Sequence, residues 1–272
     1  MSIRYGTYTI QGNREYQEDK ISVVSLNLLN IEKCSLIILC DGHSGDFCSI
    51  KTCEILPKII LNKLKNISKY ENSNSIINLL RKSIYEMDLF FEKMNENSGS
   101  TCVFCLFLNS KLFIGNIGDS RCIIGNIYNK IIYTTIDHKP NNINEKLRIE
   151  SNGGYVLLQD TYRVYINNQV GGLAISRVFG DIPYKIRNIV SCEADIVLKN
   201  IITSNEIIIL ASDGLWDVLS NEDVLKFVNA RLNKYRLTEI SKQLVNYAYY
   251  IGSMDNITVI LAKIKDDNII GI

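Results

Sequence analysis

The sequence predicts an α+β fold in which helices and strands are segregated along the chain. Apolar residues at helical spacing between Ile76 and Met94 indicate an amphipathic helix. Strand patterns separated by short turns follow from Cys102 to Thr135. Because helix pairs and strand runs do not alternate one by one, we expect packed α and β layers instead of βαβ units.

The composition favours one soluble domain that covers residues 1–272. The chain is 46% hydrophobic and 22% charged, and its three prolines form no linker between two halves. Its net charge of +1 gives no reason to expect nucleic acid as a partner. No apolar run is long enough for a membrane span and the N-terminus lacks a signal-peptide core, so we expect an intracellular protein, cytoplasmic and/or nuclear, and a monomer.

The eight cysteines do not predict a zinc site or disulfides. Cys102 and Cys105 have the spacing of a zinc or redox pair, but they lie in an alternating strand pattern. The odd offset directs their side chains to opposite faces of the strand. We expect reduced, mostly buried thiols.

Two apolar strand patterns end in Asp-Gly. Residues 36–40 lead into Asp41, and residues 206–212 lead into Asp213. Asp119 and Asp255 also lie at the ends of strand patterns. Asp-Gly turns are common, but four such acids in one domain are poorly explained by turns alone. If the carboxylates converge, their repulsion requires cations between them, so the sequence predicts a metal site.

A second acidic cluster lies near the N-terminus. Arg14 and Glu18 have the spacing of a salt bridge on a helix surface. Gly12 and the β-branched residues after Asp19 favour strand and loop instead. A guanidinium beside two carboxylates suits a phosphate that lies next to a metal.

The other elements follow from local patterns. We expect two short strands within residues 1–35, and an antiparallel meander over 102–135. We expect His138 to be structural and Arg177 and Asp181 to hold a neighbouring loop. Helices are predicted over residues 46–65 (divided or kinked at Pro57), about 143–151, 171–181, 221–232 and 238–252, and a final strand over 256–264.

Taken together, eight motifs in order resemble the PP2C (PPM) family of metal-dependent serine/threonine protein phosphatases. Each motif is weak alone, and the set covers nearly the whole chain. The motifs are Arg14 with Glu18-Asp19, residues 41–45, 98–101, 118–121, 137–140, 173–181 and 211–217, and Asp255-Asn256. The resemblance implies a central sandwich of two antiparallel β-sheets flanked by helices on both faces, with two Mg²⁺ or Mn²⁺ ions at one end.

The resemblance also implies which residues hold the metals. Asp41 would bridge both ions, and Asp213 and Asp255 would complete one site. The Gly42 carbonyl and Glu18, through water, would complete the other.

Further roles follow from the same resemblance. Asp19 would support the ligands from behind, and Asp119 and Asp217 match residues that help to hold a weaker third ion. Arg14 matches the phosphate-binding arginine and His43 the general acid. The implied substrates are phosphoproteins.

The residue types are consistent with this chemistry. Oxygen ligands select hard cations, and two such ions can lower the pKa of a shared water. A serine or threonine alkoxide is a poor leaving group, and His43 could protonate it. Neither a Cys-x5-Arg nor an Asp-x-Asp-x-Thr motif is present, so a covalent phosphoenzyme is disfavoured.

Three positions depart from the family pattern, namely Ser44, Met254 and Ala194, and none of them is an implied ligand. Residues 159–169 and 182–193 are expected to shape substrate choice. Two alternatives stay open. The chain could be a catalytically silent binding or regulatory module of the same fold, or a hydrolase of small phosphoesters.

Overall fold

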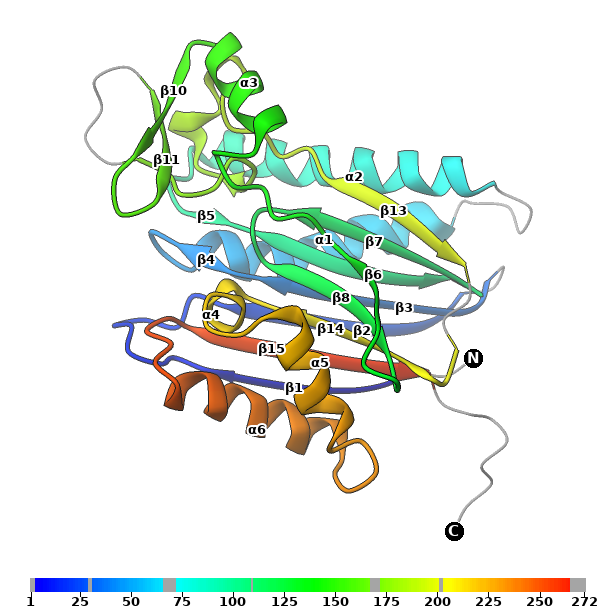
Figure 1. Cartoon of the computed structure of the whole chain (residues 1–272). Helices are drawn as coiled ribbons and strands as arrows, with labels where there is room; N and C mark the ends of the chain where they lie inside the picture. Colours follow the sequence, from blue (N-terminus) through cyan, green and yellow to red (C-terminus); the bar gives the residue numbers. More distant parts are fainter. Residues whose placement is uncertain are drawn as a thin grey trace.

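Two five-stranded antiparallel sheets face each other in the computed structural model, which describes residues 3–28, 31–65, 72–108, 110–166, 172–200 and 203–264 (Figure 1). The β14 sheet has the order β1 (Ile3–Ile10), β15 (Ile257–Ile264), β14 (Glu206–Ala211), β8 (Arg121–Asn126) and β9 (Ile131–Thr134). The β3 sheet has the order β13 (Asp195–Asn200), β7 (Lys111–Ile117), β6 (Cys102–Leu108), β3 (Ile31–Cys40) and β2 (Lys20–Leu28).

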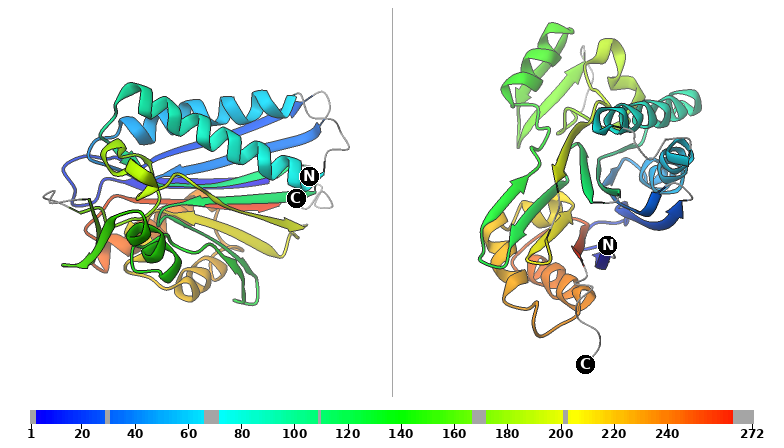
Figure 2. Two further views of the ribbon diagram at one scale, coloured as in Figure 1. Left: turned by 90° about the horizontal axis from the view of Figure 1, so that it is seen from above. Right: turned by 90° about the vertical axis from the view of Figure 1, so that its right-hand side faces the viewer.

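Helices cover the outer face of each sheet (Figure 2). The β3 sheet packs against α1 (Phe47–Lys65) and α2 (Ser73–Met94). The β14 sheet packs against α4 (Asp213–Trp216), α5 (Asn221–Asn229) and α6 (Leu237–Tyr250). The predicted sandwich with helices on both faces is therefore confirmed. Among the helices that the structure describes, none combines the length and apolar composition needed to cross a bilayer.

Strand β3 is apolar throughout its second half because both of its faces are buried. Ile37 and Leu39 lie between the two sheets, whereas Leu36 and Ile38 lie under α1 and α2. Full burial of each such side chain contributes roughly 1.5–3 kcal/mol relative to exposure. The result is a rigid strand whose end carries Asp41.

Cys102 and Cys105 lie in different layers of the core, as their odd spacing predicts. Cys102 belongs to the layer under α1 and α2, and Cys105 to the layer between the sheets. All eight cysteines are free thiols. The described residues therefore contain no disulfide.

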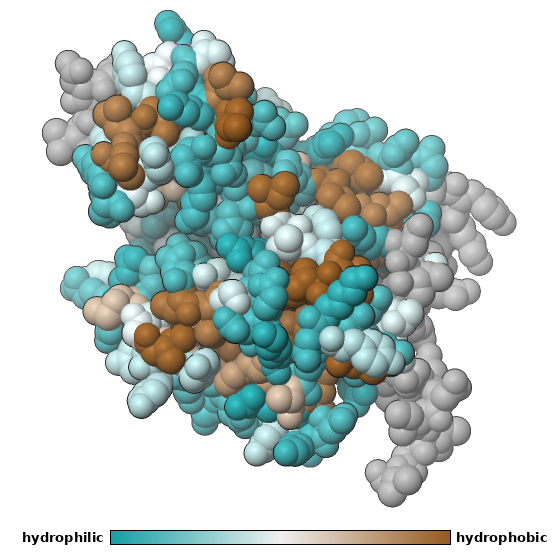
Figure 3. Space-filling model, in the orientation of Figure 1, coloured by the Kyte–Doolittle hydropathy of each residue, from teal (hydrophilic) through white to brown (hydrophobic). Residues whose placement is uncertain are grey.

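A smaller unit projects from the end of the sandwich (Figure 1). This flap unit contains α3 (Ile143–Ser151), β10 (Gly154–Leu158) and β11 (Tyr162–Ile166), and its own apolar core includes Ile149 and Val164. Leu157 and Leu158 of this unit are exposed, and so is Tyr155. Hydrophobic surface is visible on the unit in Figure 3.

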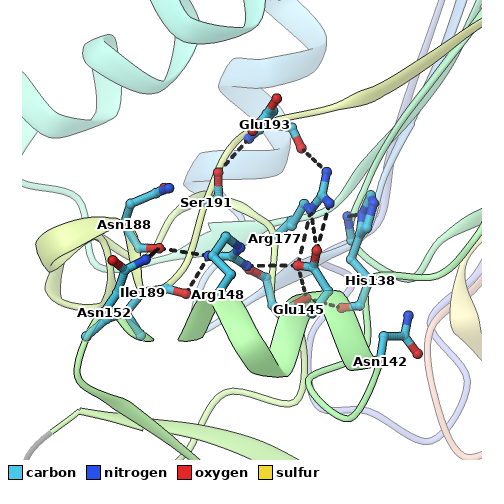
Figure 4. A network of polar contacts seen from close by, with 12 residues as sticks. His138, Asn142, Glu145, Arg148, Asn152, Arg177, Asn188, Ile189, Ser191 and Glu193 are labelled. Carbon is cyan, nitrogen blue, oxygen red and sulfur yellow. Dashed lines mark hydrogen bonds and ion pairs between the residues drawn. The ribbon is translucent and has the colours of Figure 1, made fainter. Parts of the chain in front are cut away.

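Buried charges anchor the flap unit. Glu145, on α3, accepts hydrogen bonds from Arg177 and Arg148, and Arg148 also donates to the carbonyls of Asn188 and Ile189 (Figure 4). Burial opposes ionisation, but the hydrogen bonds from Arg177, Ser176 and Arg148 outweigh it and lower the pKa of Glu145 to about 2. Arg177 therefore holds a neighbouring segment, as predicted.

Two predictions of secondary structure are wrong. Residues 172–181 are not helical, because Leu173 pairs with Val164 and because β12 (Phe179–Gly180) pairs with β5 (Gly99–Ser100). Gly180 has φ +72°, which ends any helical course. Gly171, where this helix was expected to begin, lies outside the described residues.

The second error concerns the meander. Strands β6 and β7 belong to one sheet and β8 and β9 to the other, so the chain changes sheets at residues 118–120. Gly118 makes this possible with φ +97°, where a Cβ would lie 2.7 Å from the Thr101 side chain. A Gly-Asp-Ser sequence also suits an ordinary hairpin, so the local pattern did not reveal the crossover.

The remaining boundaries shift only slightly. The predicted N-terminal strands are β1 and β2, of eight and nine residues, and helix α5 ends at Asn229 instead of near residue 232. Pro57 lies inside α1, which runs through it as one helix.

Candidate active site

The predicted acids meet at one end of the sandwich, where strands of both sheets end. Asp41 follows β3 of one sheet, Asp213 follows β14 of the other, and Asp255 precedes β15. Asp119 lies in the crossover between the sheets. These four acids line one pocket of about 350 Å³, together with Arg14, Gly42, His43, Ser44, Thr101 and Arg163.

The carboxylates repel one another. Burial, followed by the charges of Asp19 and Asp213, raises the pKa of Asp41 well above its usual range. Burial and the charges of Asp119 and Asp217 do the same for Asp213. The pKa of Asp217 is raised as well, with burial as the main cause. Carboxylates gathered in this way are stabilised by positive charge placed among them.

Two side-chain cations offset part of the repulsion. Arg14 Nη2 lies 2.5 Å from Asp255 Oδ2, and Lys139 pairs with Asp119. In the described part of the chain, no group of three or more Asp, Glu, His or Cys side chains is positioned to hold a metal ion without rearrangement. The acids are therefore gathered into one pocket but are not arranged as a finished ligand shell.

Asp19 is not among the residues that line the pocket, but its charge acts on Asp41, and its contacts show that this acidic cluster suits a cation. Its Oδ2 accepts hydrogen bonds from Ser212 (2.9 Å) and Thr258 (2.6 Å), whereas its buried Oδ1 has no hydrogen-bond donor. Burial raises the pKa of Asp19 to about 6, and the two hydroxyls limit that rise. An oxygen-only donor set with an orphaned carboxylate oxygen and raised pKa values fits a hard divalent cation.

Glu18 and Gly42 lie against each other. A Cβ at Gly42 would lie 2.7 Å from the Glu18 carbonyl oxygen, so only glycine allows this approach. Glu18 Oε1 accepts a hydrogen bond from the Gly45 N–H at 2.6 Å. Asn256 holds the preceding loop by donating to the carbonyls of Gln11 and Tyr16. The Arg14 loop is thereby fixed beside the acids.

His43 is held by a residue that sequence reasoning did not place in the site. Its Nε2 lies 2.6 Å from Oδ2 of Asp181, which was expected only to hold a loop. Burial disfavours the charged imidazole, but the hydrogen bond and charge of Asp181 outweigh it and raise the pKa of His43. By contrast, His138 accepts a hydrogen bond from the Gly118 N–H and lies 3.3 Å from Asp195, which confirms a structural role.

Lys139 and Arg163 were also missed as site residues. Lys139 was only part of a motif, and no pattern linked it to Asp119. Arg163 lies in a segment expected to shape substrate choice, and it lines the pocket while its guanidinium contacts Asp160 (3.0 and 3.1 Å) and the Gly172 carbonyl (2.9 Å). Lys139 reaches Asp119 from 20 residues away, and the Arg163 contact with Gly172 joins two segments of the chain that no local pattern links.

The three departures from the family pattern have distinct surroundings. Ser44 has φ +58°, a conformation that favours glycine. Met254 is exposed, and its sulfur accepts a hydrogen bond from Asn13. Ala194 is buried in the core under α1 and α2.

Comparisons with known proteins agree with these observations. The family model "Protein phosphatase 2C" matches residues 3–257. Protein phosphatase 1L of Bos taurus is 32% identical over 269 residues, which cover 96% of this chain and 72% of that protein. Protein phosphatase 1A of Homo sapiens is 33% identical over 276 residues, which cover 95% of this chain and 70% of that protein.

Solved structures show the same fold. A C. elegans sex determining protein superposes with a TM-score of 0.83 at 26% identity, covering 97% of this chain and 65% of that one. Serine-threonine phosphatase 2C from Toxoplasma gondii superposes with a TM-score of 0.79 at 24% identity, covering 96% and 94%. The chain therefore belongs to the protein phosphatase 2C family, the metal-dependent serine/threonine protein phosphatases.

Proposed function

We propose that this chain hydrolyses phosphoserine and phosphothreonine monoesters in proteins, with two Mg²⁺ or Mn²⁺ ions as cofactors and a weaker third ion. When bound, such ions lower the pKa of a water molecule and neutralise charge on the phosphoryl oxygens. Asp41, Gly42, Glu18, Asp213 and Asp255 would hold the two main ions, with Asp19 behind them. Asp119 and Asp217 would serve the third.

One observation carries the proposal. Asp41 and Asp213 come from opposite sheets, yet each lies in the same pocket with a pKa raised by burial and by other carboxylates. The repulsion between these carboxylates lowers the free energy of unfolding, and it serves no evident structural purpose. Phosphate-ester hydrolysis is slow without strong charge stabilisation, which bound dications supply.

Arg14 and His43 supply the remaining functions. Arg14 lies 56% exposed at the pocket, where its guanidinium can exchange Asp255 for two phosphoryl oxygens. His43 lines the same pocket and can donate a proton to the leaving alkoxide. Arg14 and His43 would therefore both contact the phosphate group of the substrate.

The proposal is tested by measuring phosphate release from a phosphothreonine peptide with Mn²⁺, with Mg²⁺ and with EDTA. We expect release only with a divalent ion, and we expect Asp41→Asn to abolish it. Glu92→Gln, an exposed carboxylate-to-amide change on α2, is the control and should keep normal turnover. No release with any divalent ion would indicate a binding module instead, and near-normal turnover of Asp41→Asn would refute its role.

A further inference from the structure

A second pocket lies at the far end of the β14 sheet from the acidic site. It has a volume of about 550 Å³ and lies between the start of β1, the end of β15 and the start of α6. The acidic site lies at the opposite ends of these strands, where Gln11 follows β1 and Asp255 precedes β15. Arg4 and Gln11 are seven positions apart along the chain, which corresponds to roughly 23 Å of strand. The two pockets are therefore distinct.

The lining of this pocket is cationic. Arg4, Arg236 and Lys263 line it, and its lining contains no aspartate or glutamate. Within the described ranges, neither Arg4 nor Arg236 forms an ion pair with a carboxylate. Glu239, in the first turn of α6, accepts a hydrogen bond from the Arg236 main-chain N–H at 2.9 Å. Three positive groups thus share a concavity in a chain whose net charge is only +1.

Two of these cations lie directly opposite each other in the sheet. Arg4 pairs with Lys263 in the register of β1 and β15, so both side chains point to the same face. The two cations therefore lie beside each other at one rim of the pocket.

The pocket wall is rigid. A Cβ at Gly6 would lie 2.1 Å from the Thr238 main-chain nitrogen, so only glycine lets α6 approach β1 so closely. Ser241 Oγ donates to the Gly6 carbonyl at 3.0 Å and fixes this contact. The N-terminus of α6, a helix of 14 residues, adds positive potential at the same place.

Aromatic and aliphatic side chains complete the lining. Tyr5 is 48% exposed and Tyr235 is 46% exposed, and Leu237 lies beside them. Cations next to apolar surface complement a peptide that carries both acidic and hydrophobic side chains. Tight binding of a nucleic acid requires many phosphate contacts along a basic surface. A chain with a net charge of +1 does not offer such a surface.

We propose that this pocket binds an acidic peptide segment of a partner protein, at a site separate from the one where phosphate is hydrolysed. Carboxylates of the peptide would lie between Arg4, Lys263 and Arg236, and its apolar side chains against the two tyrosines. Such a site would distinguish partner proteins by their charge, in addition to the selectivity of the acidic pocket.

The test is a fluorescence-anisotropy titration of the full chain with a labelled peptide that alternates glutamate and leucine. We expect saturable binding, and at least about tenfold weaker binding for the double variant Arg4→Glu/Arg236→Glu, because two attractive charges become repulsive. Arg81→Glu/Lys82→Glu, on the exposed face of α2, makes the same change in net charge and should bind like the unaltered chain.

Folding and activity are checked in the same samples. Hydrolysis of a small aryl phosphate should be unchanged in both double variants, because the pocket is remote from the acids, and both variants should still unfold in a single cooperative thermal transition. If charge reversal disturbs the fold, Arg4→Gln/Arg236→Gln replaces it, with at least about threefold weaker binding expected. No binding by the unaltered chain, equal losses in the pocket and α2 variants, or stronger binding of a single-stranded RNA than of the peptide would overturn the proposal.

Discussion

Oδ2 of Asp181 lies 2.6 Å from Nε2 of His43, although 138 residues separate them in the sequence. A small three-stranded sheet brings them together, because β4 (Gly42–His43) and β12 both pair with β5. Asp181 is 5% exposed and adopts φ +49°. The imidazole is therefore held in one orientation at the edge of the acidic pocket.

Replacing Asp181 should weaken proton donation by His43. We expect Asp181→Asn to lower kcat on a phosphothreonine peptide by roughly tenfold, a part of the 10²–10⁴ that a general acid contributes. The loss on an aryl phosphate should be smaller, because a tyrosine-like leaving group has a pKa of about 10 and needs less protonation. Steady-state kinetics on both substrates measure this.

The same comparison applies to His43 itself. His43→Ala should reduce turnover of a phosphoserine peptide more than that of the aryl phosphate. Equal losses on the two substrates, for either variant, would count against an acid role.

The turn after His43 carries a serine where glycine is favoured. Ser44 has φ +58° and Gly45 has φ +114°. Ser44→Gly should raise the free energy of unfolding by about 1 kcal/mol, and Gly45→Ala should lower it by at least as much. Urea unfolding with the divalent ion removed by EDTA measures both, and a change of the same sign in the two variants would contradict this account.

The flap unit should be sensitive to acid through Glu145. Its pKa is lowered from 4.5 to about 2 in the folded protein, so its stabilising effect is complete above about pH 4.5 and is lost as the pH falls toward 2. Glu145→Gln should destabilise the chain by about 3 kcal/mol at neutral pH, because it leaves Arg148 and Arg177 without their buried anion.

Glu145→Gln should also remove part of the acid sensitivity. The urea midpoint of the unaltered chain should fall more between about pH 5 and about pH 3 than that of the variant. Parallel curves for the two proteins would show that Glu145 does not contribute.

Removing a charge from the acidic pocket should stabilise the metal-free chain. The raised pKa of Asp41 means that its ionised form is disfavoured by folding at neutral pH. Asp41→Asn should therefore raise the thermal midpoint in EDTA, while the increase that Mn²⁺ produces in the unaltered chain should disappear. A lower midpoint in EDTA, or an unchanged response to Mn²⁺, would argue against Asp41 as a ligand.

The sequence predicted the layers because long apolar patterns determine them. Residues 36–40 are buried on both faces, and α3 has the predicted bounds, since both patterns depend on local periodicity. The helix expected over 171–181 failed because Leu173 and Val178 pack into the flap core without helical geometry. Apolar spacing alone does not distinguish these cases.

The site was predicted in its residue types but not in its contacts. The acids were recognisable because each follows or precedes a strand pattern. Asp181 on His43 and Lys139 on Asp119 depend on pairings between distant segments, which local patterns do not encode. Some motif residues proved structural instead, since Arg121 forms a two-point contact with Asp137 (2.7 and 2.9 Å).

Both sheets supply acids to the pocket, so the packing between the sheets affects the catalytic rate. How far apart Asp41 and Asp213 stand is set by the side chains stacked between the sheets, such as Leu39 and Leu210. Interiors are packed as densely as crystals, so the gain or loss of one methylene there is transmitted as a shift of the layers. Relatives with identical polar residues can thus differ in rate through hydrocarbon volume alone.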